Sequence, residues 1–483
     1  MSGSAPHPSP VGWLWHADAF DDGHRHFAPQ KGRVAPPIPY ATPAARRGTD
    51  LCLGERPHAI SDTEEKYRMN LFPRRAGRIA RPVLTLVVSL LAVSTADAQH
   101  GGTPPSTSTV PHSASGPTAV HWNALARSFV GGGHGGGHGA PAGAHGGAHG
   151  GAMPMPSRPL ALLSVAQHAA SRAAATPGEA HVAVAAASAD VLGYLFPGAA
   201  ARFAEMRSEA LAAAARADLE PARVTAADSL GRAAAAAVLA RARADGSDAA
   251  WQGAVPAGTG RWTSAANATP MGTTWAGVRP WALATSDQLR PAAPPAMGTP
   301  VFDADLDEVR QATRNRTPEQ LASARKWAEM PIPAYWNEVA VELITQGGLP
   351  ASRAAEALAS LNVALMDAQI ACFDAKYAHW SIRPSQADPG IDVPVELPNF
   401  PAYPSGHACL SAAAAEVLGH YFPARQAQLA ATAQEVADSR LYAGVHYRVD
   451  NDVGLEMGRQ VARLVIPAVV AGLEVGGPQR NAR

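Results

Sequence analysis

Apolar residues recur at helical spacing through most of the chain after residue 157. Runs rich in Ala, Leu and Val cover 179–196, 200–219 and 222–244, with Pro-Gly after the first and Gly246 after the last. No alternating strand pattern stands out. Two further stripes have apolar residues spaced three and four apart, namely Leu358, Leu361, Leu365, Ala368 and Cys372, and Val453, Met457, Val461 and Val465. The pattern predicts an all-α fold, a helical bundle with long irregular loops.

Residues 251–300 interrupt this helical pattern. Four tryptophans stand here among many Pro and Gly residues, which predicts an irregular loop anchored by aromatic side chains. Helices are expected to resume near residue 303. Thr317-Pro318-Glu319-Gln320 then has the residue order of a capping box, which predicts another helix start.

The N-terminal part of the chain shows no such period. Residues 1–68 are interpreted as a disordered upstream extension. In 69–98, four arginines precede a short apolar run and an Ala-x-Ala site, which is typical of a secretory signal peptide with translation starting at Met69. The apolar run is shorter than a membrane span. The mature chain is therefore expected to be periplasmic or secreted and to lack a membrane span, with 99–118 as a linker.

Residues 131–152 form a Gly/His-rich tract that contains His134, His138, His145 and His149. Such a tract buries too little apolar area to offset its conformational entropy. A flexible insertion is the favoured interpretation, and metal binding by its imidazoles is the alternative. The tract interrupts a helical domain assigned to 119–475, and 476–483 is a C-terminal tail.

Charge and cysteine content exclude several classes of protein. The 483 residues include 40 Lys and Arg and 40 Asp and Glu, and this neutral balance argues against nucleic-acid binding. Three cysteines exclude a disulfide-rich scaffold and a four-cysteine zinc site. Cys372 and Cys409 remain in the mature chain, and they could pair in an oxidising compartment.

The first of three motifs is Lys376 followed by Arg383-Pro384. A spacing of seven places both cations on one face of a continuous helix over 351–383, the face of the apolar stripe. A cation that points inward needs an anionic partner. The alternative is two surface basic residues with apolar stems.

The second motif is Pro404-Ser405-Gly406-His407 before a predicted helix over 408–421. Free backbone N–H groups at a helix start bind anions, Ser405 adds a hydroxyl and Gly406 permits close approach. His407 is a candidate general acid or base. An ordinary capped helix with a surface histidine fits this segment equally well.

The third motif is Ser439-Arg440, His446 and Asp450. Arg440 is a forked donor for phosphate-like oxygens, and His446 and Asp450 are four apart, on one helical face. Arg440 and His446 are six apart, so we expect Gly444 to bend or break the helix between them. A core histidine with ordinary partners is the alternative for His446. Together the three motifs predict an oxyanion site for a tetrahedral dianion.

These three motifs, in this order and spacing, resemble the signatures shared by vanadium-dependent haloperoxidases and type 2 phosphatidic-acid and bacterial acid phosphatases. The similarity runs from about residue 120 to 470. It implies a helical bundle with vanadate or phosphate among the helix ends. The sequence of Phe400–His407 resembles the haloperoxidase branch, and Phe373 stands where a fungal chloroperoxidase has tryptophan.

The resemblance implies a role for each motif residue. His446 would be the axial vanadium ligand, or the nucleophile of a phosphatase, and Asp450 would orient it. His407 would be the acid–base residue, and Lys376 would polarise bound peroxide. Phe400 and Phe373 would border the halide. The equatorial oxygens would be bound by Lys376, Arg383, Ser405, Gly406 and Arg440.

The function predicted from the sequence is a secreted vanadium-dependent haloperoxidase with vanadate as cofactor and hydrogen peroxide and halide as substrates. Bromide is favoured over chloride as the substrate. A small organic acceptor and a homodimer are compatible with this function. An acid phosphatase acting through phosphohistidine is the enzymatic alternative, and a non-catalytic oxyanion-binding protein is the third. The acidic partner expected for Arg440 has two candidates, Glu338 and Glu342.

Overall fold

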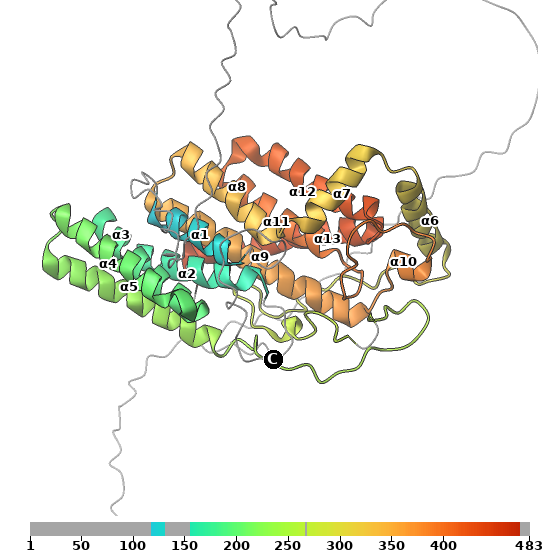
Figure 1. Cartoon of the computed structure of the whole chain (residues 1–483), viewed down its shortest axis with the longest axis horizontal. Coiled ribbons are helices and arrows are strands. Elements are labelled where there is room, and N and C mark those ends of the chain that lie inside the picture. The colour runs from blue at the N-terminus through green and yellow to red at the C-terminus, as the bar shows by residue number, and fades with distance from the viewer. Residues whose placement is uncertain (1–116, 131–154, 266–267, 474–483) are drawn as a thin grey trace, which may run out of the picture. The chain divides into compact units, whose positions relative to one another are not determined.

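Helices form the body of the computed structural model, which describes residues 117–130, 155–265 and 268–473 (Figure 1). Within these ranges the structure has no β-strand, which confirms the all-α prediction. The segments interpreted from the sequence as an extension, a signal peptide and a C-terminal tail lie outside the described residues, as do nearly all of the expected linker and the Gly/His tract. The helices are α1 (Thr118–Val130), α2 (Ser157–Ala173), α3 (Pro177–Leu195), α4 (Ala200–Arg216), α5 (Pro221–Ala242), α6 (Pro300–Arg314), α7 (Pro318–Glu329), α8 (Ile332–Gly347), α9 (Ala351–His379), α10 (Pro384–Ala387), α11 (Gly406–Tyr421), α12 (Gln426–Tyr442) and α13 (Arg448–Ala471), with short 3₁₀ turns at Pro197–Ala199, Trp275–Gly277 and Pro423–Arg425.

α9 is the central helix of the bundle. Nearly every side chain from Ala354 to Lys376 is buried, because α2, α8, α11 and α13 pack around it. A helix that is apolar on all sides is expected in such a position. The last turns of α9, which include Lys376, therefore lie in the protein interior.

Local sequence signals set several helix ends. Thr317 and Gln320 form the predicted capping box at the start of α7. Thr176 and Glu179 form another at the start of α3. The predicted helix over 351–383 is too long, because α9 ends at His379 and Trp380 follows with a left-handed φ of 51°. Lys376 and Arg383 are therefore not on one helical face.

The irregular loop before α6 is held by carboxylates of α9 as well as by its aromatic residues. Asp367 is fully buried and accepts hydrogen bonds from the backbone N–H groups of Trp281, Ala282 and Leu283 at 2.8, 2.7 and 3.1 Å. Arg290 donates two hydrogen bonds of 2.7 Å to Asp374. The prediction of an ordered irregular loop is confirmed, and its attachment places it beside the C-terminal turns of α9.

Close packing of α11 against α13 positions the N-terminus of α11. The two helices approach each other closely at Gly458 of α13. A Cβ added there would lie 2.1 Å from the carbonyl oxygen of Cys409 and 2.8 Å from the backbone nitrogen of Ala413, both in α11. Both atoms belong to the backbone, so they cannot yield by a change of rotamer. The two helices must therefore separate to admit any side chain.

Replacing Gly458 with alanine is expected to lower the free energy of unfolding by about 1–3 kcal/mol, the usual cost of an overpacked interior. Urea denaturation followed by circular dichroism measures this change. Gly198→Ala is the control, because a Cβ there meets nothing within 4 Å. Equal stability of the two variants would contradict the close approach of α11 and α13.

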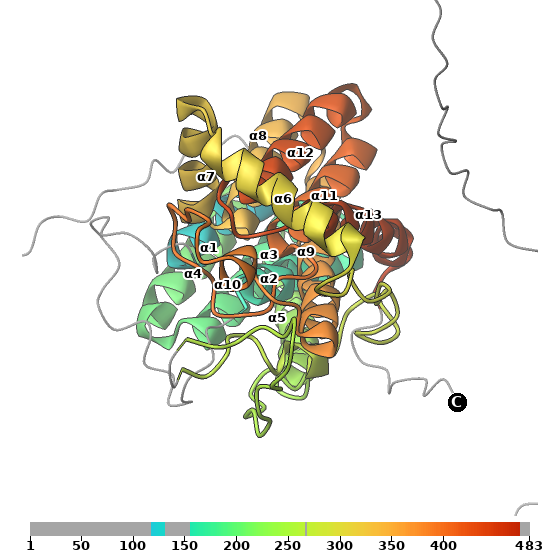
Figure 2. The same ribbon diagram turned by 90° about the vertical axis from the view of Figure 1, so that its right-hand side faces the viewer.

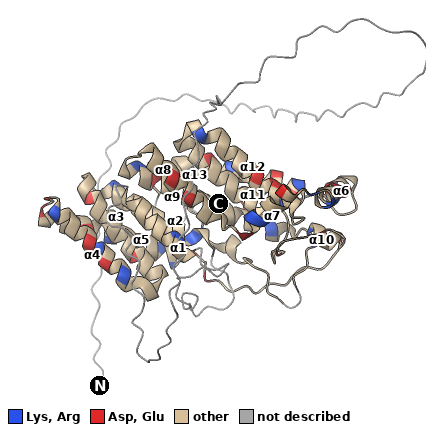
Figure 3. Ribbon diagram, turned by 45° about the horizontal axis from the view of Figure 1, so that its top comes forward, with Lys and Arg blue, Asp and Glu red and all other residues tan. Residues whose placement is uncertain are grey.

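Charged residues of both signs are interspersed along the helices (Figure 3), in keeping with the neutral overall balance. Among the helices that the structure describes, none combines the length and apolarity needed to cross a bilayer.

Candidate oxyanion site

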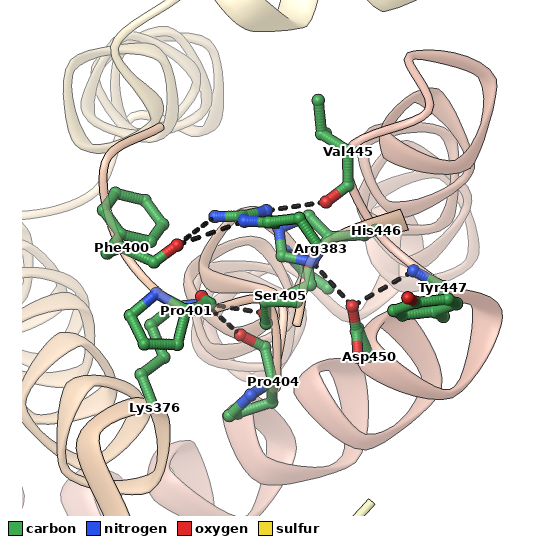
Figure 4. A network of polar contacts seen from close by, with 12 residues as sticks. Lys376, Arg383, Phe400, Pro401, Pro404, Ser405, Val445, His446, Tyr447 and Asp450 are labelled. Carbon is green, nitrogen blue, oxygen red and sulfur yellow. Dashed lines mark hydrogen bonds and ion pairs between the residues drawn. The ribbon is translucent and has the colours of Figure 1, made fainter. Parts of the chain in front are cut away.

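The three motifs meet where the end of α9, the start of α11 and the start of α13 come together (Figures 2 and 4). Lys376 belongs to α9, Arg383 is the residue before α10, and Ser405 is the residue before α11. Arg440 comes from α12 and His446 from the loop between α12 and α13. Sequence segments some 70 residues apart thus supply one site.

Lys376 is fully buried, and backbone carbonyls surround its ammonium group. Its Nζ donates to the carbonyl oxygens of Pro401, Ala402 and Pro404 at 2.9, 2.8 and 2.5 Å. These carbonyls stand where the sequence led us to expect an anionic partner. Burial lowers the pKa of Lys376 to about 7.

Arg383 lies at the centre of the site (Figure 4). Its guanidinium donates to the carbonyl oxygen of Phe400 at 3.1 and 3.0 Å, to that of Val445 at 2.6 Å and to Nε2 of His446 at 3.1 Å. Burial lowers the pKa of Arg383 to about 10, so the group stays cationic at neutral pH. Arg383 thus links the segment before the second motif to the third motif around a fixed positive charge.

Aromatic rings border the two cations. The Lys376 ammonium lies 4.9 Å from the ring centroid of Phe400 and 6.0 Å from that of Phe373. Phe373 packs edge-on against Phe400 at 5.1 Å and against Trp275 at 4.4 Å. The irregular loop therefore brings an indole to Phe373, a contact that the sequence motifs did not reveal.

Ser405 and Gly406 form the start of α11. The Ser405 side chain caps the helix by accepting from the backbone N–H of Ala408, and its own N–H donates to the carbonyl oxygen of Asp450 at 2.8 Å. Ser405 is fully buried. The positive end of a 16-residue helix is thereby fixed beside the start of α13.

Gly444 ends the helical path between Arg440 and His446, as predicted. Its φ of +70° follows the end of α12 at Tyr442, and α13 begins at Arg448. His446 therefore precedes α13, and the expectation that His446 and Asp450 share a helical face is wrong. The two side chains nevertheless meet, with His446 Nδ1 2.9 Å from Asp450 Oδ2.

The contacts of His446 define its tautomer. Nδ1–H donates to Asp450, and Nε2 is left with its lone pair toward the Arg383 guanidinium. Burial, followed by the nearby Arg383 and Lys376 charges, lowers the pKa of His446 well below its usual range. Asp450 also accepts the N–H of Tyr447 at 3.0 Å, and burial raises its pKa to about 7. His446 is thus a neutral imidazole whose unprotonated Nε2 accepts from Arg383 in the free site and is the ring nitrogen that can act as ligand or nucleophile.

Backbone carbonyls of α7 hold Arg440 and His407. Arg440 donates to the carbonyl oxygen of Ala324 at 2.6 Å, and His407 Nε2 lies 2.9 Å from that of Trp327. Burial lowers the pKa of Arg440 to about 10, and burial together with the Arg440 charge lowers that of His407 to about 3. His407 is therefore neutral in the free site.

Glu338 and Glu342 do not serve as acidic partners of Arg440. Glu338 instead pairs with Arg127 at 3.4 Å, and Glu342 accepts from Gln346 at 2.8 Å. No sequence signal points to the carbonyl of Ala324, because every residue type has the same backbone carbonyl. Cys372 and Cys409 are both free and buried beneath the site, so the disulfide considered from the sequence does not form.

The arrangement suits a tetrahedral oxyanion. Three cations are buried beside one helix N-terminus, namely Lys376, Arg383 and Arg440. Asp450 is a carboxylate that interacts with Lys376 and Arg383. His446 Nε2 offers a lone pair to the central atom of such an anion. Donors of this kind fit vanadate and phosphate alike.

Comparisons with known proteins bear on the fold and on the segment that contains the three motifs. Residues 357–472 match the family model of the PAP2 superfamily. A bacterial vanadium-dependent iodoperoxidase structure superposes with a TM-score of 0.56 at 21% identity, covering 68% of this chain and 93% of its own. An apo-type bacterial vanadium-dependent chloroperoxidase gives a TM-score of 0.55 at 15% identity, covering 67% and 96%.

The holo-type bacterial chloroperoxidase gives a TM-score of 0.51 at 15% identity, covering 66% of this chain and 92% of its own. No curated protein sequence matches the chain. The resemblance noted from the motifs is thus supported by a PAP2-superfamily match over residues 357–472, and the helical body has the fold of the bacterial vanadium-dependent peroxidases on which it superposes.

Proposed function

We propose that this chain is a vanadium-dependent haloperoxidase that oxidises halide with hydrogen peroxide to hypohalous acid. The observation that carries the proposal is His446 Nε2, an unprotonated imidazole nitrogen held 3.1 Å from Arg383 among three buried cations. The fold shared with an iodoperoxidase and a chloroperoxidase supports it. We propose bromide as a better substrate than chloride, and an exported protein because of the signal-like segment at 69–98.

In this proposal His446 Nε2 would hold vanadate. Lys376, Arg383 and Arg440 would neutralise its negative charge, with Ser405 and the N–H of Gly406 as further donors. Bound vanadate supplies Lewis-acid activation of peroxide without a change of oxidation state. Asp450 keeps His446 Nδ1 protonated, and so keeps Nε2 available. His407 accepts a proton from the incoming peroxide, and Phe400 and Phe373 border the halide.

An acid phosphatase is the second candidate function, favoured by the PAP2 match over 357–472. His446 Nε2 would then attack phosphorus, and the same cations would stabilise the charge that develops on the phosphoryl oxygens. The third candidate is oxyanion binding without turnover.

One paired assay separates the three candidates. Purified protein is supplied with vanadate, hydrogen peroxide and bromide, and in parallel with an aryl phosphate without vanadate. We expect bromide oxidation that depends on vanadate. Phosphate release that vanadate inhibits, with no halide oxidation, would favour the phosphatase. Inactivity in both assays with retained binding of the anion would favour the binding protein.

Oxyanion affinity is expected to fall as pH rises through about 7. Lys376 has its pKa near 7 and loses its positive charge above it, while Asp450, also near 7, gains a negative charge. Both changes weaken binding, by up to about tenfold per pH unit for each group. Tungstate, a dianion of constant charge near neutrality, is the probe for calorimetry between pH 6 and 9.

Lys376→Met is the matched variant for this titration, because it removes the first of the two groups. We expect weaker tungstate binding with a shallower pH dependence. Affinity of the unmodified protein that stays constant from pH 6 to 9 would contradict the assignment of Lys376 to the anion.

A further inference from the structure

The C-terminal half of α7 lies directly on the oxyanion site. Its carbonyl groups at Ala324 and Trp327, about one turn apart, accept hydrogen bonds from Arg440 at 2.6 Å and from His407 at 2.9 Å. The carbonyl end of a helix carries partial negative charge, which favours nearby cations and N–H donors. The carbonyl groups of α7 thus accept the hydrogen bonds of Arg440 and His407, a role that a carboxylate could otherwise fill.

The Trp327 carbonyl is available because α7 ends there. The last four carbonyls of a helix lack partners within it, and α7 ends at Glu329. The residue four positions after Trp327 is Pro331, which has no N–H to donate. The imidazole of His407 takes the place of the missing donor.

A carbonyl oxygen accepts hydrogen bonds and cannot donate them, so the ring atom that faces it must carry hydrogen. His407 Nε2 is therefore N–H. Nδ1 makes no hydrogen bond with the described residues, and the charges nearest the ring are the site cations Arg440, Lys376 and Arg383. In a neutral imidazole, Nδ1 is then the unprotonated nitrogen.

We propose that the carbonyl end of α7 fixes His407 as the Nε2–H tautomer, so that Nδ1 exchanges the proton with the reacting oxyanion, and that Trp327 is the positioning residue. The role in proton exchange rests on the proposed function. The tautomer does not, because it follows from the contacts of the free site.

The Trp327 side chain anchors this arrangement to the helix that carries Arg440. Its indole Nε1–H donates to Glu435 of α12 at 2.8 Å, and the ring is fully buried against Tyr335, with centroids 4.9 Å apart. Glu435 and Arg440 are both on α12. One indole hydrogen bond therefore ties α7, whose carbonyls hold Arg440 and His407, to α12, the helix that carries Arg440.

The tautomer is measured by ¹⁵N NMR of histidine-labelled protein, without vanadate, near pH 7. Signals of His407 are assigned by their loss in His407→Gln. We expect Nε2 to carry the hydrogen and Nδ1 to show the shift of an unprotonated nitrogen. A neutral His407 with hydrogen on Nδ1 in the unmodified protein would overturn the proposal, whatever the activity of the protein.

Trp327→Phe tests the positioning role, with Trp336→Phe as the matched control. Trp336 is also fully buried, and its Nε1 donates to Ser411 Oγ of α11 at 3.1 Å, so the control loses an equivalent indole hydrogen bond away from α7. We expect Trp327→Phe alone to mix the His407 tautomers and, in the loaded enzyme, to lower kcat roughly tenfold. Unchanged tautomers in Trp327→Phe, or equal mixing in both variants, would refute a specific role for Trp327.

Discussion

Replacement of His446 by alanine is expected to abolish halide oxidation and to weaken vanadate binding by more than about 100-fold. His446 Nε2 is the lone pair that the site offers to the central atom of an oxyanion, and it faces Arg383 at 3.1 Å. The variant keeps Lys376, Arg383 and Arg440, so weak electrostatic binding of the anion should remain. Equilibrium dialysis of vanadate and bromide oxidation at saturating vanadate measure the two losses.

His145→Ala is the control for this experiment. His145 belongs to the Gly/His tract, where imidazoles offer an alternative place for adventitious metal binding. We expect activity and vanadate affinity to be unchanged. A full loss of activity from His145→Ala, with His446→Ala active, would place the reaction outside the site formed by the three motifs.

Asp450→Ala is expected to have the second-largest effect, a loss of about 10–100-fold in vanadate affinity or activity. Asp450 Oδ2 accepts from His446 Nδ1 at 2.9 Å and from the Tyr447 N–H at 3.0 Å. Alanine leaves both buried donors without an acceptor and frees His446 to place its hydrogen on Nε2. Vanadate titration and thermal unfolding should both report the change, because an unpaired buried donor costs about 1–3 kcal/mol.

Two further variants test whether the missing acceptor oxygen causes that loss. Asp450→Asn retains an acceptor oxygen and should recover much of the vanadate affinity. Glu456→Ala removes a more exposed carboxylate from the same helix, where it pairs with Arg459 at 3.3 Å, and should change neither property. If Asp450→Ala has as little effect as Glu456→Ala, the inference that Asp450 orients His446 is wrong.

Local sequence signals predicted much of the fold. The periodic runs correspond to α3, α4 and α5, and the Thr317 capping box begins α7. The end of α9 was missed because Trp380 takes a left-handed conformation that a bulky residue rarely adopts. No glycine, the usual sequence signal for such a helix end, stands at this position. Arg383 therefore reaches the site from a loop, although the expected spacing placed it on the helix.

The motif residues could be found from the sequence, and so could the pairing of His446 with Asp450, whereas the partners of the buried cations could not. We expected carboxylates beside the buried cations, but Lys376 donates to backbone carbonyls such as those of Pro401 and Pro404. Arg440 donates to the carbonyl of Ala324 and to the hydroxyl of Ser439. Any residue type can present a carbonyl, so only the fold specifies these contacts. The neutral overall charge likewise conceals three cations that the helix ends bring together.

The central claim is that the site of His446 and Arg383 uses vanadate to oxidise halide. The most direct measurement is the rate of bromide oxidation as metal-free protein is titrated with vanadate at fixed hydrogen peroxide. We predict activity that rises from zero and saturates near one vanadate per chain, and that excess phosphate suppresses. No activity at any vanadate level, together with vanadate-inhibited hydrolysis of an aryl phosphate, would contradict the account.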